Sequence, residues 1–486
     1  MELTFIGAAQ VLIGLSLLLA GSVEAMFGFM LFSALFGGSA AIALPALGGS
    51  SIPPVQFALV FVAMRLLVPG AGQMAALGQA SRANLWLIAF VAYGAVLAYI
   101  APHLFAGQIE VTPLRGRTEA RYISTRAFIY STKPLAFSAQ NITTSIYLIG
   151  TLFAGIAAHV ACQRDSGRAK LVRTMAVVGI LHALIGFFSI AVKGTPAEEL
   201  LLIFRNGAYA QLDHSYRGFV RMTGIWPEAS GFANFAVVWF VFVFECWLRR
   251  IDTRWTGTAA IALAGALAFS TSSTAYVGLP LYALMLVARG LLFPGALRAD
   301  RAMWIAAGAL AFVAITCGVM LWRPVFATEF VDLIRHMTID KTNSLSGTQR
   351  RFWAWQGIEA FLYTGGIGIG PGSFRSSSLA TAVLGSTGLI GAVALTAHIL
   401  NAFKPLRFST YGATEDPALG TGAAAAWAML MGVIVASISL PSCDPGTDFA
   451  ILAGAALALR TRAAKPVDVR LHMAQTFAMG PKPQAA

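Results

Sequence analysis

Apolar stretches of about 15 to 23 residues alternate with polar loops along almost the whole chain. A transmembrane helix needs about 20 apolar residues, so the pattern predicts 12 or 13 spanning helices. The count is open by one because only the segment Gly21 to Glu24 separates the first two stretches. The stretches are 4–21, 25–47, 54–69, 83–105, 143–161, 174–192, 229–248, 256–272, 274–290, 303–322, 379–401, 421–441 and 447–461.

The composition supports a membrane protein. Of the 486 residues, 57% are hydrophobic and 11% are charged, whereas a soluble domain carries about 25% charged residues. Because so few charged groups cannot cover a soluble surface, lipid is expected to solvate much of the chain. The predicted fold is all-α, with a single polytopic transmembrane domain over 1–465 and a short polar tail over 466–486.

The basic residues of the short loops predict the orientation. Under the positive-inside rule these loops and the C-terminal tail face the cytoplasm. The residues are Arg164, Arg168, Lys170, Arg173, Arg249, Arg250, Arg254, Arg289, Arg298, Arg301, Lys404 and Arg407. The three longest loops, about 106–142, 193–228 and 323–378, are then expected to face the periplasm from a bacterial inner membrane. The net charge of +13 does not indicate nucleic-acid binding, because the basic residues form no soluble basic domain.

The predicted outer loops are also rich in arginine, which the positive-inside rule does not explain. The planar arginine side chain binds phosphate through two N–H groups at once, so this enrichment predicts an anionic, phosphate-bearing ligand. The basic residues of the three loops are Arg115, Arg117, Arg121, Arg126, Lys133, Arg205, Arg217, Arg221, Arg323, Arg335, Lys341, Arg350, Arg351 and Arg375.

One group of candidate residues ends the second long loop. Pro227 and Ser230 suit the first turn and cap of a helix, so a purely structural interpretation exists, with Trp226 at the membrane interface. In the functional interpretation, Arg221 holds phosphate and Glu228 holds a sugar hydroxyl at the outer mouth of the bundle.

A second group lies in the third long loop. Residues at helical spacing there are mostly apolar, which predicts an amphipathic helix at the membrane interface. Arg350 and Arg351 stand at its start, where the helix N-terminus adds positive potential for a phosphate. A structural lid is the alternative interpretation. The spaced residues are Phe352, Trp355, Ile358, Glu359 and Leu362.

The glycine-rich segment 365–374 is not predicted to bind a nucleotide. It follows no predicted strand and lacks the Lys-Ser/Thr ending of a phosphate-binding loop, so we expect a glycine-rich turn that re-enters the bilayer. Among the histidines, His336 beside Arg335 is the best candidate, and His214 and His103 also lie on the predicted outer side. No metal or cofactor is predicted, because the chain has no HExxH, DxD or CxxC pattern.

Four segments, in their order along the chain, resemble the O-antigen ligase and polymerase superfamily of bacterial envelope glycan assembly. The resemblance covers most of 130–400. The motif Arg221-x-x-Gly224-x-x-x-Glu228-Ala-Ser230 is similar to the arginine motif of this superfamily in its glutamate-bearing polymerase form. The other segments are Pro134–Tyr147, the serine-rich turn Ser270–Thr274, and Arg350–Gly391 with its closing Gly388-Leu-Ile-Gly391.

One departure from the superfamily pattern bears on the reaction. Its ligases carry a histidine eleven residues before the first glycine of the closing Gly-x-x-Gly motif, and this chain has Ser377 there. Together with the glutamate of the arginine motif, the serine favours a polymerase over a ligase.

The resemblance implies a GT-C-like, metal-independent glycosyltransferase at the outer face of the inner membrane. Its donor would be a glycan on undecaprenyl pyrophosphate and its acceptor another lipid-linked repeat unit. Membrane lipids and a chain-length regulator are the further partners implied. The predicted catalytic residues are Arg221, Glu228, Arg350 and His336, and the predicted substrate-binding residues are Arg217, Arg351, Arg121, Arg126 and His214. Glu228 is the first candidate for the general base, with His336 and His214 next.

Three other functions stay open at this point: a glycan ligase, a transporter or flippase of lipid-linked glycans, and a structural scaffold. Transporters often show repeat symmetry and broken helices with sites at the midplane, whereas the conspicuous residues here lie in predicted outer loops. A scaffold would explain the composition but not the arginines of those loops.

Overall fold

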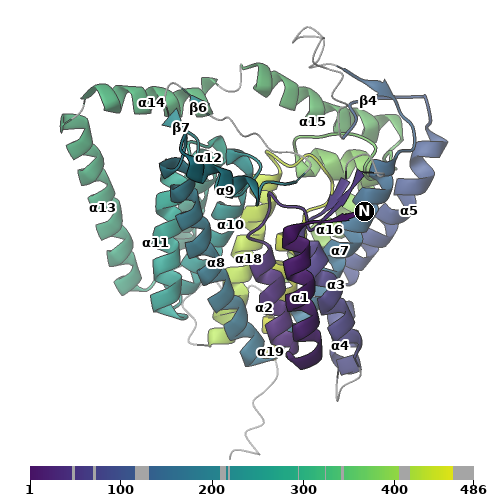
Figure 1. The fold of residues 1–486 in the computed structure, drawn as a ribbon, viewed down its shortest axis with the longest axis horizontal. Helices are drawn as coiled ribbons and strands as arrows, with labels where there is room; N and C mark the ends of the chain where they lie inside the picture. Colours follow the sequence, from purple (N-terminus) through teal and green to yellow (C-terminus); the bar gives the residue numbers. More distant parts are fainter. Residues whose placement is uncertain are drawn as a thin grey trace, which may run out of the picture.

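The computed structural model is mainly helical, with most helices in one bundle and one helix standing beside it (Figure 1). Each of the thirteen predicted apolar stretches contains a helix. The structure describes all residues except 46–49, 69–72, 115–130, 208–214, 217–218, 294, 323, 341–343, 404–415 and 464–486.

Eight helices in the described part of the chain are long and apolar enough to cross a membrane. The chain therefore has the architecture of a multi-pass membrane protein. The eight helices are α5 (Leu85–Leu104), α7 (Ala139–Cys162), α8 (Asp165–Ala191), α10 (Ala229–Leu248), α12 (Ser273–Leu292), α13 (Ala299–Trp322), α16 (Leu379–Phe403) and α18 (Pro417–Ala436).

The other five predicted spans correspond to shorter helices. One of them, α2, has 11 residues, which at 1.5 Å per residue is about 16 Å, and a bilayer core is about 30 Å thick. The eight long helices are thus fewer than the 12 or 13 spans expected. The shorter helices are α1 (Phe5–Ala20), α2 (Val23–Ser33), α3 (Pro54–Leu67), α11 (Thr253–Phe269) and α19 (Thr447–Ala463).

The predicted span 25–47 is wrong, because α2 ends at Ser33 and the chain then turns into β2 (Ile42–Leu44). β2 pairs antiparallel with β1 (Glu2–Leu3) and with β3 (Ser50–Ile52). Two glycines in the turn explain the break. A Cβ at Gly37 would lie 2.3 Å from the Trp226 ring, and one at Gly38 would lie 2.2 Å from a backbone oxygen. The turn at Gly37 and Gly38 therefore packs so closely against residues 225 and 226 that only glycine fits.

The remaining elements lie at the ends of the bundle. They are α4 (Gln73–Ala83), the 3₁₀ turn Pro196–Glu198 with α9 (Glu199–Leu202), α14 (Pro324–Thr338), α15 (Leu345–Tyr363), and two hairpins, β4 (Glu110–Val111) with β5 (Lys133–Pro134) and β6 (Ser215–Tyr216) with β7 (Phe219–Val220).

We call the end of the bundle that carries α14 and α15 the α15 end; it is the upper end in Figure 1. α5 finishes there and α10 begins there, so the described parts of the first two long loops lie at this end. The short basic loops after α7, α10 and α12 lie at the opposite end. The two predicted sets of loops are therefore on opposite ends of the bundle.

The centre of the bundle is formed by α7, α19, α18 and α10, which pack in that order. Small residues permit close contact between the first two helices. A Cβ at Gly454 of α19 would lie 2.1 Å from the carbonyl oxygen of Gly155 in α7. Close backbone approach through small residues is the usual way in which membrane helices associate.

A buried ionic cluster joins three helices near the opposite end. The Glu245 carboxylate in α10 accepts hydrogen bonds from Tyr282 (2.6 Å) and Arg289 (2.9 Å) of α12. It also forms an ion pair with Arg249. The Arg289 guanidinium lies 5.0 Å from the ring centre of Trp427 in α18. The cluster therefore fixes α12 to both neighbouring helices.

α13 stands beside the bundle (Figure 1). Within this described helix, no residue of the apolar window is buried, and its substantial packing is with α14. Its first turn is held to the bundle, since Asp300 pairs with Arg250 at 2.6 Å and Arg301 stacks on Trp247 at 4.4 Å. The helix is thus fastened at both ends, and its apolar length is exposed, as expected for a helix that lipid surrounds.

A helix is present where the sequence predicts one in the third loop, as α15. That this helix is amphipathic and lies at the membrane interface stays a prediction. Its side toward the bundle carries Gln356 and Gly357, both buried. A Cβ at Gly357 would lie 2.3 Å from the Thr381 oxygen, so this glycine lets α15 contact α16 closely. The apolar residues Trp355 and Leu362 are 57% and 65% exposed and point away from the bundle.

Candidate functional site

Arg221 and Glu228 lie together at the α15 end, between β7 and α10. The Nε–H of Arg221 donates to the carbonyl oxygen of Thr271 at 3.3 Å, in the turn between α11 and α12. Glu228 is the residue before the first turn of α10, and the Ser230 hydroxyl donates to its carboxylate. Ser230 therefore orients the carboxylate of Glu228 instead of capping the helix.

Arg350 belongs to the same electrostatic environment. Burial lowers the pKa of the Arg221 guanidinium below its usual value, and the negative charge of Glu228 opposes this shift. The positive charge of Arg350 lowers the pKa further, and Tyr276 opposes it. Since guanidinium stays charged in proteins, Arg221 lies within electrostatic range of one carboxylate and of a second cation.

The sequence predicts Arg350 at the start of its helix, but the structure places it further along. Ser344 caps α15, with its hydroxyl accepting from the Gly347 N–H at 3.1 Å, so Arg350 lies in the second turn. The backbone oxygen of Arg350 accepts a hydrogen bond from the Ser377 hydroxyl at 2.5 Å. The segment before α16 thus holds the arginine in place, while the adjacent Arg351 is exposed.

The serine-rich turn 270–274 forms the wall beside Arg221. Thr271 adopts a left-handed conformation (φ 49°), which turns its carbonyl oxygen toward the arginine. Ser272 is fully buried, and its hydroxyl finds no hydrogen-bond partner among the described residues. A buried polar group without a partner is costly and calls for a bound ligand or water.

Arg205 has a structural role, although it belongs to the arginine-rich set. Its guanidinium donates to Gly224 O at 3.0 Å and to the Thr223 hydroxyl at 2.7 Å. The Gly224 N–H in turn donates to the Ser189 hydroxyl at 3.1 Å. Arg205 therefore shapes the loop that carries Arg221, and it does not offer its guanidinium to a ligand.

Trp226 is half-buried and packs against other aromatic side chains. Its ring centre lies 6.1 Å from that of His182 and 4.9 Å from that of Phe235. Its packing against these rings fixes the loop between Arg221 and Glu228 to the bundle. That Trp226 lies at a membrane interface stays a prediction.

The remaining predicted site residues are placed elsewhere or lie outside the described residues. His336 lies half-buried in the last turn of α14, beside Arg335. It is not among the described groups whose charges shift the pKa of Arg221. Arg121, Arg126, His214 and Arg217 fall in the ranges that the structure does not describe.

In the glycine-rich segment, residues 368–374 are buried, whereas Gly365 and Ile367 are exposed. The N–H groups of Gly368, Ile369 and Gly370 donate to Thr364 Oγ1, Gly385 O and Ser386 O at 2.8 to 3.0 Å. The N–H groups that a nucleotide would need are therefore used within the protein. That the segment re-enters a bilayer stays a prediction.

A further carboxylate near this segment was not predicted. Asp444, in the loop between α18 and α19, accepts hydrogen bonds from the Thr151 hydroxyl (2.8 Å) and the Gly446 N–H (3.1 Å). In the same loop, the carbonyl oxygen of Pro441 accepts a hydrogen bond from the Ser376 N–H at 2.9 Å. The sequence signal was available, as two aspartates stand within 442–448, between two apolar stretches.

The fold defines the class of the protein, a multi-pass helical membrane protein. At its α15 end, Arg350 and Glu228 lie within electrostatic range of Arg221. The sequence matches no protein-family model and no curated protein. The described residues contain no group of three or more metal-ligating side chains.

Proposed function

We propose that the protein is a membrane glycosyltransferase that polymerises a surface polysaccharide from lipid-linked repeat units, with the α15 end at the outer face of the bacterial inner membrane. The observation that carries the proposal is the grouping of Arg221, Arg350 and Glu228. These residues come from two loops about 120 positions apart in the chain.

The chemistry suits paired arginines. The bond that breaks joins the anomeric carbon of the donor glycan to an oxygen of polyprenyl pyrophosphate, which leaves with the electron pair. Negative charge grows on that oxygen in the transition state. Fixed guanidinium groups bind the growing charge more strongly than the ground state, and this lowers the barrier.

Glu228 is the group that takes the proton. The bond that forms joins a hydroxyl oxygen of the acceptor unit to the anomeric carbon, and the hydroxyl proton passes to a base. The Glu228 carboxylate is held by Ser230 next to the two arginines.

The position of Ser377 supports a polymerase over a ligase. In the superfamily that the sequence resembles, ligases have a histidine at the corresponding place. Here the Ser377 hydroxyl donates to the backbone of Arg350, so this position adjoins the paired arginines. A serine there supplies no base of histidine type.

The test uses purified protein in proteoliposomes with an undecaprenyl-pyrophosphate repeat unit and reads glycan length on a gel. Removal of one donor to a developing oxyanion costs about 3 kcal/mol, or roughly a hundredfold in rate. Arg221→Ala and Arg350→Ala should each slow the formation of the glycan ladder roughly a hundredfold or more. Arg254→Ala is the matched control, because Arg254 is exposed at the opposite end.

Two results would contradict the proposal. A ladder that persists in both arginine variants would show that the paired cations are not needed for the chemistry. Movement of the intact lipid-linked unit between leaflets, without any ladder, would identify a transporter instead.

A further inference from the structure

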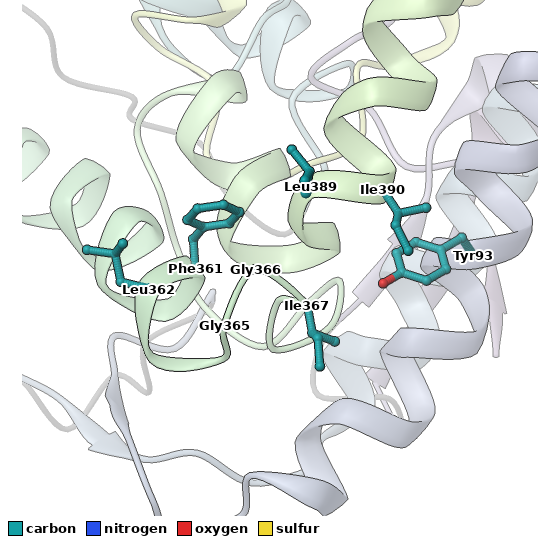
Figure 2. A pocket seen from close by; sticks show the side chains of 8 residues that line it. All are labelled: Tyr93, Phe361, Leu362, Gly365, Gly366, Ile367, Leu389 and Ile390. Atoms are coloured by element: carbon teal, nitrogen blue, oxygen red, sulfur yellow. The ribbon is translucent and has the colours of Figure 1, made fainter.

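A hollow of about 400 Å³ lies on the side of the bundle away from α13, at the end of α15 that is remote from Arg350. Its wall comes from α5, the last turn of α15, the glycine-rich segment and α16. Figure 2 shows Tyr93, Ile367 and Ile390 gathered on one side of it and Phe361 on the other. The full lining is Tyr93, Phe361, Leu362, Gly365, Gly366, Ile367, Leu389 and Ile390.

The lining selects hydrocarbon. The described residues around the hollow include no charged side chain, and the Tyr93 hydroxyl is the one polar side-chain group among them. Leu389 and Ile390 are 58% and 59% exposed, on a helix long and apolar enough to span a membrane. The hollow is therefore open toward lipid, and its volume lies within the ordinary range for pockets that bind small molecules.

The hollow is formed before any ligand enters. α16 is interrupted at Gly388 (φ 59°, ψ −156°), where a Cβ would lie 2.0 Å from the carbonyl oxygen of Gly366. The next residue, Leu389, donates its N–H to that oxygen at 2.8 Å. The glycine-rich wall is thus hydrogen-bonded to the broken helix, which fixes the positions of both.

We propose that this hollow holds the isoprenoid tail of a lipid-linked substrate whose phosphate is bound at Arg350. This inference rests on the proposed function and names where one of its substrates lies. α15 connects the two places directly, because it carries Arg350 in its second turn and Phe361 near its end.

Length distinguishes an isoprenoid from an ordinary phospholipid. Eleven helical residues separate Arg350 from Phe361, which is about 16 Å. One acyl chain covers about half of a 30 Å hydrocarbon core, roughly 15 Å. A phospholipid with its phosphate at Arg350 would thus end where the hollow begins, whereas a long isoprenoid would continue into it. The last turn of α15 carries no basic residue that would hold a phospholipid headgroup directly above the hollow.

The experiment uses full-length protein in nanodiscs and photoreactive lipids, so that it does not depend on turnover. The probes are undecaprenyl phosphate and farnesyl phosphate, each with a diazirine at the tail end, and phosphatidylglycerol with a diazirine on its acyl chain. Undecaprenyl phosphate should label the segments around Phe361 and Ile390, and unlabelled undecaprenyl phosphate should compete. Ile390→Trp and Arg350→Ala should each reduce that labelling several-fold.

Leu284→Trp is the matched control, because Leu284 is also exposed on a spanning helix but lies outside the hollow. It should leave the labelling unchanged. Equal labelling by the phosphatidylglycerol or farnesyl probe would overturn the inference, and so would labelling that is indifferent to Arg350→Ala. Specific labelling without a glycan ladder would keep the lipid site and reject the polymerase. A glycan ladder without such labelling would keep the polymerase and reject the lipid site.

Discussion

Replacing Glu245 with alanine is expected to destabilise the bundle by about 3 to 5 kcal/mol, the usual cost of removing one partner from a buried ion pair. The Glu245 carboxylate is fully buried between two arginines of α10 and α12. Its loss would leave Arg249 and Arg289 close together, without the negative charge that now lies between them.

The magnitude follows from the contacts that disappear. The carboxylate accepts a hydrogen bond from Tyr282 and is paired with both arginines. A hydrogen bond to a charged group contributes about 1.5 to 3 kcal/mol, so three independent losses would amount to about 4.5 to 9 kcal/mol, mostly above the expected range. Movement of the two guanidinium groups toward water at the nearby end of the bundle offsets part of the cost.

Thermal unfolding in detergent, followed by the fraction of monodisperse protein, measures the effect. The double variant Glu245→Leu/Arg289→Met should be less destabilised than Glu245→Ala, because it removes a positive charge together with the negative one. Glu359→Ala is the control, since Glu359 is exposed on α15. A Glu245→Ala variant within about 0.5 kcal/mol of wild type, the range of surface substitutions, would refute the reasoning.

Three further outcomes are expected. Asn141→Ala removes two hydrogen bonds to the glycine-rich segment and should cost about 1 to 3 kcal/mol in thermal unfolding. Gly388→Ala should cost more than that, because its Cβ would collide with backbone. Gly432→Ala should be neutral or stabilising, because its Cβ would only make an ordinary contact with Val238 at 3.5 Å. A hydrogen bond from Lys193 lowers the pKa of Glu198, so its contribution is complete above the ordinary pKa and is lost as the pH falls through the lowered one. The protection of the 193–198 turn against hydrogen exchange, taken relative to the intrinsic exchange rate at each pH, should therefore fall in acid, and a Glu198→Gln variant should not show that change.

The helices could be predicted because they follow from hydrophobicity and length alone. Five predicted spans are shorter helices, and among them the stretch 25–47 departs most from the prediction. It is apolar throughout most of its length but contains Gly37 and Gly38. What ends the helix is their contact with the 225–226 loop, almost two hundred residues away in the chain. A contact of that kind leaves no mark on local periodicity.

The candidate site was predictable in part for a similar reason. Arg221, Glu228 and Arg350 could be selected because charged residues near apolar stretches are conspicuous. Arg205 has the same sequence context, yet its guanidinium donates a hydrogen bond to Gly224 O and stabilises the loop that carries Arg221. This role depends on the fold of the loop around it. Ser272 belongs to a recognised serine-rich turn, but only the fold shows that its hydroxyl is buried and unpaired.

The separation of α13 from the bundle gives the protein its own reporter group. Cys317 lies in this helix and is exposed, whereas Cys162, Cys246 and Cys443 are buried. A maleimide dye that enters the hydrocarbon region should therefore mark a single position without any engineered cysteine. Its fluorescence would follow the polarity and mobility of the surrounding lipid, and a change on adding substrate would show that α13 moves relative to the bundle.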